Sequence, residues 1–265
     1  MIIRCREDPK SCLKAVLLSR LHRAEIASEN EPYPSLFDQV ETSASREPWN
    51  GILARYEQSF GPVPWLHCER DLEYLASEIL FVFRFPAQNN LSLVTQVISQ
   101  ALDRGFTYVA NRASREAKAF GERAHQVRLA WGKALGLMRF VRVEQDAEKL
   151  LVGKCPVPYR IADLAIWHFA RRFPGYQIVI VAPEGAAVVR KGKFCWEPSA
   201  PYEGFLKDDR FDLWWQTFYK SQYIPERRNR RLAMHGVPKK YWAWVTEGLA
   251  IDDPRVMEEW GKRDS

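Results

Sequence analysis

The sequence predicts an α+β protein that is mostly helical, with a small antiparallel sheet of about four to five strands in the middle and a three-helix segment near the C-terminal end. Apolar residues recur at three- and four-residue steps over most of residues 1–135. From Gly136 the period changes to two, as in the alternating stretch 137–143. After residue 200 the helical period returns in three stretches, because prolines begin helices and glycines end them. The first begins at Asp208 or Asp209, the second runs from Pro225 to Gly236, and the third from Pro238 to Gly248.

Length and composition favour a folded protein with a sizeable core. The chain has 265 residues, of which 46% are hydrophobic and 27% charged. These values are ordinary for a globular protein. We expect one compact domain with three sub-regions: a helical region 1–135, a β-rich region with one helix 136–200, and a basic-aromatic helical segment 201–250.

Local signals place the first elements. Ile2 and Ile3 suggest a short edge strand, and Asp8 followed by Pro9 is typical of a helix start. A second helix is predicted from Pro48 to Phe60, and further helices over 72–85, 91–102 and 113–135. The last of these carries many cations, which form either a solvated face or a DNA-facing one; we favour the solvated face because glutamates balance it.

In the central region the expected order is two strands, one helix and three strands. Strong β-forming runs and turn residues predict strands at 137–143, 150–152, 176–181, 187–190 and 194–196, with an amphipathic helix at 161–173. Strand–helix–strand alternation with glycine-rich turns is missing from this pattern. We therefore expect an antiparallel sheet packed on one helix rather than a doubly wound parallel sheet.

The stretch from Arg210 to Glu247 interleaves aromatic residues with eight Lys and Arg residues and only three acids. It contributes most of the chain's net charge of +6, and the sequence pI is about 9.1. Cations beside aromatic surfaces suit an anionic polymer with bases that stack. The alternative is a core helix with a solvated basic face.

Several kinds of chemistry lack their sequence signature. There is no phosphate-binding loop, no G-x-G-x-x-G, no G-x-S-x-G and no zinc-deaminase motif. Five scattered cysteines without a C-x-x-C pair predict reduced thiols, no metal and no cofactor. The chain shows no signal-peptide or membrane-spanning run, so we expect a cytoplasmic protein that does not bind a membrane.

Two stretches carry candidate site residues. Around the predicted helix 161–173, Asp163 is either a helix-turn acid favoured by the dipole or a carboxylate that faces a pocket. His168 is a candidate base or a semi-buried structural histidine, and the five-residue step does not put it on the face of Asp163. Near the C-terminus, residues 232–241 are expected to form a turn between two helices. This turn either binds a phosphate, loosely like the hairpin of helix–hairpin–helix glycosylases, or only packs the two helices together.

The chain also resembles a known bacterial family of DNA-metabolism proteins, a domain of unknown function found beside radical-SAM DNA-repair-like proteins and fused to uracil-DNA-glycosylase-like domains. The resemblance is carried by Gly136–Phe140, His168–Ala170, Arg172–Pro174, Leu213–Ile224, Glu226–Arg227, Asn229 and Pro238–Trp242. It covers roughly Pro34 to Glu247 and is strongest over the final forty or so residues. It implies a role in DNA metabolism.

Two positions depart from the pattern of that family. Where the family tends to have a P-D-H-like triplet before the central helix, this chain has Val157-Pro158-Tyr159. Where the family tends to have an acid and a histidine before Gly136, this chain has Ala130 and Gly132. Either this member acts on a different substrate or those positions are not catalytic.

The leading hypothesis is a DNA glycosylase of repair or phage defence that flips and excises a modified base, such as a glycosylated or hydroxymethylated cytosine of phage DNA, leaving an abasic site. Asp163 and His168 are the expected catalytic residues. The expected partners are DNA and other DNA-repair or defence proteins. The alternatives are a non-catalytic DNA-binding module that partners a repair enzyme, and a protein-interaction scaffold. The expected DNA-binding residues are Tyr159, Arg172, Trp215, Lys220, Arg227, Arg228, Asn229, His235, Lys239, Lys240 and Tyr241.

Overall fold

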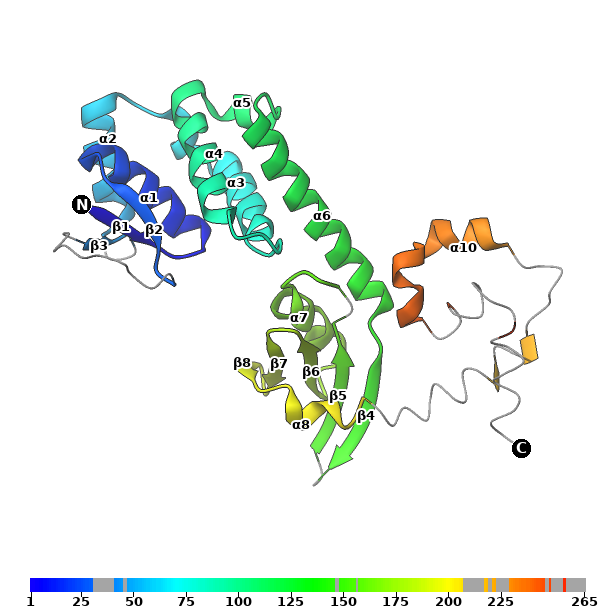
Figure 1. Cartoon of the computed structure of the whole chain (residues 1–265). Coiled ribbons are helices and arrows are strands. Elements are labelled where there is room, and N and C mark those ends of the chain that lie inside the picture. The colour runs from blue at the N-terminus through cyan, green and yellow to red at the C-terminus, as the bar shows by residue number, and fades with distance from the viewer. Residues whose placement is uncertain are drawn as a thin grey trace. The chain divides into compact units, whose positions relative to one another are not determined.

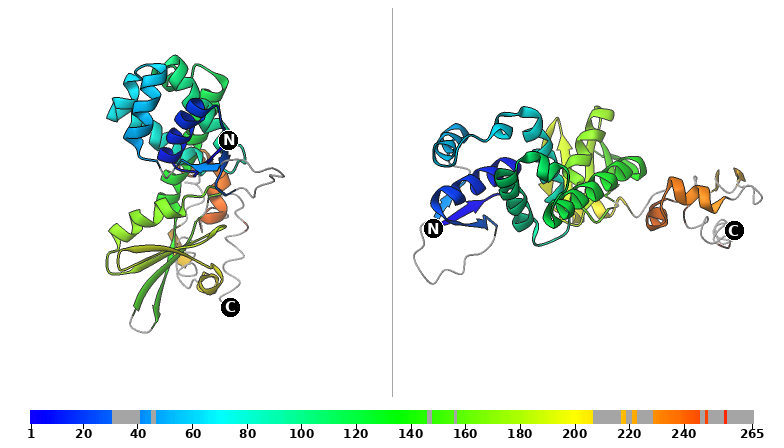
Figure 2. Two further views of the ribbon diagram at one scale, coloured as in Figure 1. Left: turned by 90° about the vertical axis from the view of Figure 1, so that its left-hand side faces the viewer. Right: turned by 90° about the horizontal axis from the view of Figure 1, so that it is seen from above.

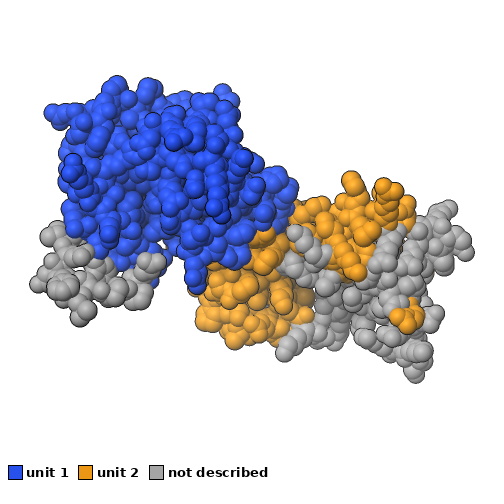
Figure 3. All heavy atoms as spheres, turned by 45° about the horizontal axis from the view of Figure 1, so that its top comes forward, with its two compact units in different colours: residues 1–130 blue, residues 131–265 orange. Residues whose placement is uncertain are grey.

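The computed structural model describes residues 1–30, 41–44, 47–145, 148–155, 157–206, 217–218, 221–222, 229–245, 248 and 255. The chain divides into two compact units, Met1–Ala130 and Trp131–Ser265, which are coloured separately in Figure 3. The boundary falls within helix α6 (Arg115–Leu137), close to the predicted end of the helical sub-region. The single compact domain stays a prediction.

Unit 1 contains a small parallel sheet with strand order β2-β1-β3, formed by β1 (Ile2–Cys5), β2 (Glu25–Ser28) and β3 (Glu41–Ser43). The edge strand predicted at Ile2 and Ile3 is therefore the central strand. Helix α1 (Pro9–His22) connects β1 to β2, so unit 1 begins with the strand–helix–strand unit that the sequence did not suggest. Strands of only three or four residues carry too little period-two pattern to predict their pairing.

The predicted helices of unit 1 are confirmed. The Asp8 side chain caps α1 by accepting a hydrogen bond from the Ser11 amide at 2.8 Å, and Pro9 occupies the first turn. Pro48 precedes α2, and Gly61 follows it with a φ of 90°. The remaining helices are α2 (Trp49–Phe60), the 3₁₀ turn η1 (Pro64–His67), α3 (Glu69–Val82), α4 (Asn90–Arg104), α5 (Phe106–Ala110) and α6.

Unit 2 is built on a five-stranded sheet in the order β4-β5-β6-β7-β8 (Figure 1). The strands are β4 (Phe140–Gln145), β5 (Glu148–Lys154), β6 (Gln177–Ala182), β7 (Gly185–Arg190) and β8 (Lys193–Glu197). The strand number and chain order agree with the prediction, but the fully antiparallel sheet is wrong because β5 and β6 run parallel. Helix α7 (Ala162–Arg172) returns the chain to the starting end of the sheet, as a parallel pair requires.

The two faces of this sheet are covered by different helices (Figure 2). Helix α7 packs on β6 and β7 through Ala162, Ala165, Ile166 and Phe169, all buried. On the opposite face the short helix α8 (Ala200–Glu203) adds Tyr202 to the core. That second core contains Val152, Val179, Val181, Ala186 and Val188.

Two tight turns fix the ends of strands β6, β7 and β8. Ala182 pairs with Gly185, so Pro183 and Glu184 form the turn between β6 and β7. Arg190 pairs with Lys193, and the turn residues Lys191 and Gly192 have φ values of 48° and 74°. Two consecutive positive φ angles are typical of the tight hairpin turn that matches strand twist. This turn lies between the strands predicted at 187–190 and 194–196.

The C-terminal segment is described in part. Helix α10 (Arg230–Gly236) and the 3₁₀ helix η3 (Lys239–Trp244) lie within the second and third predicted ranges, but the three-helix segment as a whole is not confirmed. The first predicted helix, which begins near Asp208, falls mainly outside the described residues. Within the described ranges, no helix is both long and apolar enough to cross a membrane.

Candidate functional site

The candidate site lies at the carboxyl ends of the parallel strands β5 and β6. The Cys155 amide donates to the Val181 carbonyl at 2.7 Å, which continues the β5–β6 pairing one residue past the end of β5. The chain then loops through residues 157–161 into α7, so the first turn of α7 lies at this edge. The carboxyl edge of parallel strands is where α/β proteins gather ligand-binding groups.

Two carboxylates lie at this edge, close enough for the charge of Asp163 to act on Glu184. Asp163 is a half-buried acid in the first turn of α7, and Glu184 is in the turn that follows β6. Partial desolvation raises the pKa of Glu184; Arg160 opposes the shift, and the negative charge of Asp163 adds to it. The carboxyl of Glu184 therefore keeps its proton to a higher pH than an ordinary glutamate. Neighbouring carboxyl groups with one raised pKa are a common acid–base arrangement in active sites.

Cys155 is beside the same carboxylates, but its chemistry is different. The thiol is buried, and burial raises its pKa to about 11, with further contributions from the charges of Glu184 and Asp163. A thiol with this pKa stays protonated near neutral pH and is a poor nucleophile. The site therefore offers carboxylates, and not a thiolate, as its reactive groups.

A cluster of three aromatic rings flanks the carboxylates. The Trp167 ring on α7 lies 6.4 Å from the Phe194 ring on β8, and Phe194 lies 5.7 Å edge-on from Trp196, centroid to centroid. Trp167 is 39% exposed and Trp196 is 44% exposed. A side chain at Gly185, the residue after Glu184, would be 3.8 Å from the Trp196 ring. We call Trp167, Phe194 and Trp196 the aromatic platform.

Helix geometry places Asp163, Trp167 and Arg171 along one ridge of α7. The residues are spaced by four, so each lies on the next turn of the same face. His168, five residues after Asp163, is displaced by about 140° around the helix axis. His168 is exposed, and its ring meets the Phe169 ring edge-on at 5.2 Å. The two residues expected to be catalytic are therefore not brought onto a shared face.

Tyr159 and Arg172, which were expected to bind DNA, lie at the two ends of α7. Tyr159 is half-buried in the loop before the helix, and its carbonyl accepts from the Ile161 amide at 2.9 Å. Arg172 is exposed in the last turn, with its guanidinium 5.6 Å from the centre of the Phe173 ring. Tyr159 thus lies in the loop that precedes Asp163, whereas Arg172 lies at the far end of α7.

The C-terminal candidates separate into structural and exposed residues. Asn229 caps α10 by accepting from the Leu232 amide at 2.8 Å, and Tyr241 is only 5% exposed. His235 and Lys239 are exposed. Lys240 belongs to η3, but its side chain is not described. Trp215, Lys220, Arg227 and Arg228 lie outside the described residues.

The described contacts of the 232–241 corner favour a packing role. The Val237 amide donates to Ala233, and the Tyr241 amide donates to Pro238, both at 2.8 Å. The Gly236 carbonyl accepts from the Lys133 ammonium at 3.1 Å, and the Val237 carbonyl accepts from the Trp242 indole at 2.7 Å. Amides already bonded within the fold are not offered to a phosphate.

Unit 2 has a strongly basic surface over its described residues. Its exposed carboxylates there are Glu144, Glu184 and Glu203. The exposed cations of the same ranges are Arg142, Lys149, Lys154, Arg160, Arg171, Arg172, Arg190, Lys191, Lys193, Arg231, Lys239 and Arg255. Across the described part of the chain, no group of three or more His, Cys, Asp or Glu residues is arranged to hold a metal ion.

The sequence reasoning missed Glu184, Trp167, Phe194, Trp196 and Arg171. A signal existed for Trp167, because it departs from the buried stripe of the amphipathic helix and follows Asp163 by four residues. Glu184 had no comparable signal. It stands in a turn, and only the pairing of β5 with β6 brings that turn to the start of α7.

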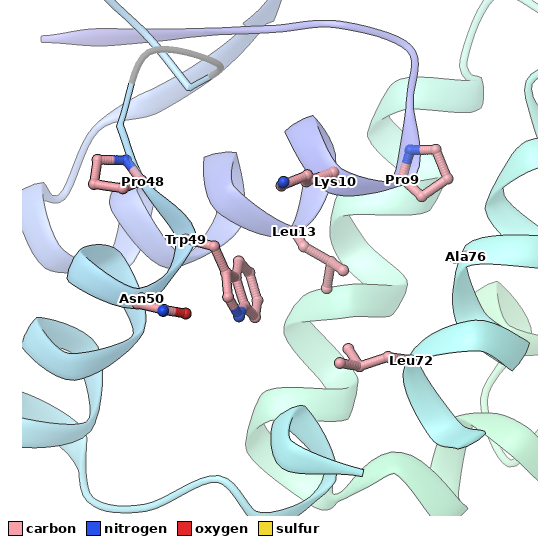
Figure 4. A pocket seen from close by; sticks show the side chains of 8 residues that line it. All are labelled: Pro9, Lys10, Leu13, Pro48, Trp49, Asn50, Leu72 and Ala76. Carbon is pink, nitrogen blue, oxygen red and sulfur yellow. The ribbon is translucent and has the colours of Figure 1, made fainter. Parts of the chain in front are cut away.

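Unit 1 contains a separate open cavity of about 550 Å³. Trp49 points into it between α1, α2 and α3 (Figure 4). Its lining residues are Pro9, Lys10, Leu13, Pro48, Trp49, Asn50, Leu72 and Ala76. Apart from Lys10 and Asn50 the lining is apolar, so the cavity lacks the carboxylates and clustered cations of the site in unit 2.

Comparison with known proteins adds one finding. The family described as "Domain of unknown function (DUF4130)" matches residues 88–247, which is more than half of the chain. No curated protein and no solved structure matches the chain. The matched range contains the carboxylate pair and the aromatic platform, whereas the cavity of unit 1 lies before it. The chain therefore belongs to the DUF4130 family.

Proposed function

We propose that this protein is a DNA-acting enzyme that excises a modified base, with the carboxylate pair Asp163 and Glu184 as its reactive groups. The observation that carries this proposal is the placement of both carboxyl groups at the carboxyl edge of β5 and β6, where the charge of Asp163 contributes to a raised pKa of Glu184. The basic surface of unit 2 supports a polyanionic substrate. The proposed context remains repair or phage defence in the cytoplasm.

The two carboxyl groups take different roles in this reaction. Glu184 in its protonated form donates the proton to the departing base as the C1′–N bond breaks and its electron pair stays on the base nitrogen. Asp163 as a carboxylate stabilises the positive charge that develops on the sugar. Water then adds to C1′ and gives its proton to Asp163, which leaves an abasic site. His168, on a different face of α7, is not part of this step.

The test is an abasic-site assay on duplex and single-stranded DNA that carries a panel of modified bases, including glycosylated and hydroxymethylated cytosine. Asp163→Asn and Glu184→Gln should each lower the rate of excision by roughly 10²-fold or more. Glu144→Gln is the matched control, because Glu144 is an exposed acid of the same unit that pairs with Arg142. It should leave the rate unchanged.

The second candidate function is a non-catalytic DNA-binding module that serves a repair or defence enzyme. The exposed rings of the aromatic platform favour it, since binding alone would use them. This role predicts salt-sensitive binding, no abasic product on any substrate, and no effect of Asp163→Asn on the partner's activity. Absence of product together with intact binding would therefore exclude the enzyme and leave the module.

A further inference from the structure

The aromatic platform has no role in the excision chemistry. In the described part of unit 2, however, it is a cluster of contacting aromatic rings in which two large rings are exposed. Trp167 and Trp196 are both more than a third exposed, and Phe194 lies between them at 6.4 Å and 5.7 Å. Two partly exposed indoles in one cluster of rings form a contiguous apolar patch, and such patches often mark binding sites.

The platform joins a helix to an edge strand. Among the described residues, β8 is an edge strand and pairs only with β7. Its residues Phe194 and Trp196 point to the face that α7 covers. On the opposite face of β8, Glu197 is held by Arg190 at 2.6 Å and by the Tyr202 hydroxyl. The backbone that carries the rings is therefore fixed from its other side.

Charge is graded along the platform. At one end, Arg171 follows Trp167 by one helical turn, and Lys191 is in the turn that leads into the strand of Phe194. Lys193 lies on the opposite face of β8, because side chains alternate along a strand. Arg171 and Lys191 are both exposed. At the other end are the carboxylates, because Asp163 precedes Trp167 by one turn and Gly185 lies beside the Trp196 ring. A polyanion placed on the rings would be held at the cationic end and directed toward the carboxylates.

We propose that the aromatic platform binds single-stranded DNA, with unpaired bases stacked on Trp167 and Trp196 and the adjacent phosphates facing Arg171 and Lys191. Exposed ring faces stack on bases that are already unpaired, whereas duplex bases have their faces covered. Aromatic rings combined with cations are the usual means of binding a single strand without reading its sequence. This inference rests on the proposed function and specifies its substrate as a single strand or an unwound region.

The test uses fluorescence anisotropy with the full chain and two labelled strands of equal length: an oligothymidylate and an abasic strand that keeps the phosphates but has no bases. Wild-type protein should bind the oligothymidylate about tenfold more tightly than the abasic strand, since stacking contributes about 1–3 kcal/mol per base. Trp167→Ala and Trp196→Ala should each remove most of that preference. Phe60→Ala, which truncates an exposed ring of unit 1, should keep it.

Arg171→Gln supplies a second measurement that leaves the rings intact. It should weaken binding to both strands equally and lower the slope of log K against log salt by about 0.7. The proposal that the platform stacks the bases of single-stranded DNA would be overturned by equal affinity of wild-type protein for the two strands. Tighter binding to duplex DNA or to single-stranded RNA would overturn it as well. Base-dependent binding without abasic product would overturn the excision reaction alone, and absence of any DNA binding would overturn both proposals.

Discussion

Gly153 on β5 pairs with Phe140 on β4, and the Phe140 ring occupies the space that a side chain at position 153 would need. A Cβ atom at Gly153 would be 2.9 Å from the Phe140 ring and 2.7 Å from the Arg139 carbonyl oxygen. The Phe140 ring in turn meets Phe169 of α7 edge-on, 4.7 Å between centroids. Because Gly153 has no side chain, the Phe140 ring can lie over β5 and contact Phe169 of α7.

Gly153→Ala should destabilise unit 2, because the Arg139 carbonyl and the Phe140 ring must both move. We expect a loss of about 1–3 kcal/mol in the free energy of unfolding, measured by urea denaturation. Gly136→Ala is the control, since a Cβ there meets no atom within 4 Å and lies in α6. That change should be neutral or stabilise by up to about 1 kcal/mol. An equal effect of the two substitutions would contradict this packing account.

Tyr202 ties α8 to the edge of the sheet through Glu197 and Arg190. Its hydroxyl donates to Glu197 and accepts from Arg190 at 2.7 Å. Tyr202→Phe should lower the free energy of unfolding by about 1–2 kcal/mol at neutral pH. Tyr74→Phe, at an exposed tyrosine of unit 1, should change it little.

The same tyrosine makes a pH prediction. Burial and the hydrogen bond to Glu197 raise the pKa of Tyr202 to about 12 from its ordinary value of 10.0. The folded state thus holds this proton more tightly than the unfolded chain. Its contribution to stability is complete below pH 10 and is lost as the pH rises toward 12. Melting temperatures between pH 9 and 12 should fall less steeply for Tyr202→Phe than for wild type.

Arg128 compensates a buried carboxylate. Glu78 is 3% exposed and pairs with the guanidinium of Arg128, which also lies 4.9 Å from the centre of the Phe81 ring. Arg128→Met leaves the Glu78 charge buried without its cation and should cost about 3–5 kcal/mol in unfolding free energy. Arg142→Met breaks an exposed ion pair with Glu144 and should cost less than about 1 kcal/mol. The double variant Glu78→Gln with Arg128→Met should recover much of the loss.

The five free cysteines should differ in reactivity. Native protein treated with iodoacetamide at pH 8 should be alkylated at the exposed Cys195 and, more slowly, at the half-buried Cys68. Cys5, Cys12 and Cys155 are buried and should react only after unfolding, which peptide mass mapping can follow. Partial desolvation raises the pKa of Cys195, and Glu197 raises it further. Glu197→Gln should therefore speed alkylation at Cys195, and unchanged kinetics would argue against this electrostatic effect.

The sequence by itself determined the elements whose signals are local. Asp8 and Pro9 begin α1, Pro48 and Gly61 bound α2, and Lys191-Gly192 makes the turn between β7 and β8. Caps, proline and glycine act through bonds to residues within a few positions, so a single chain contains the information needed to predict them.

Only the tertiary structure decided which strands pair and in what direction. The parallel pairing of β5 with β6 brings Glu184 to Asp163, and the β7–β8 hairpin brings Phe194 to Trp167. The sequence therefore predicted Asp163 as a candidate but not its companion carboxylate. It also predicted a nucleic-acid surface in the last quarter of the chain, whereas the surface that we propose from the structure lies on α7 and β8. Periodicity specifies which face of an element is apolar, whereas the partner of that face depends on burial and register across the whole sheet.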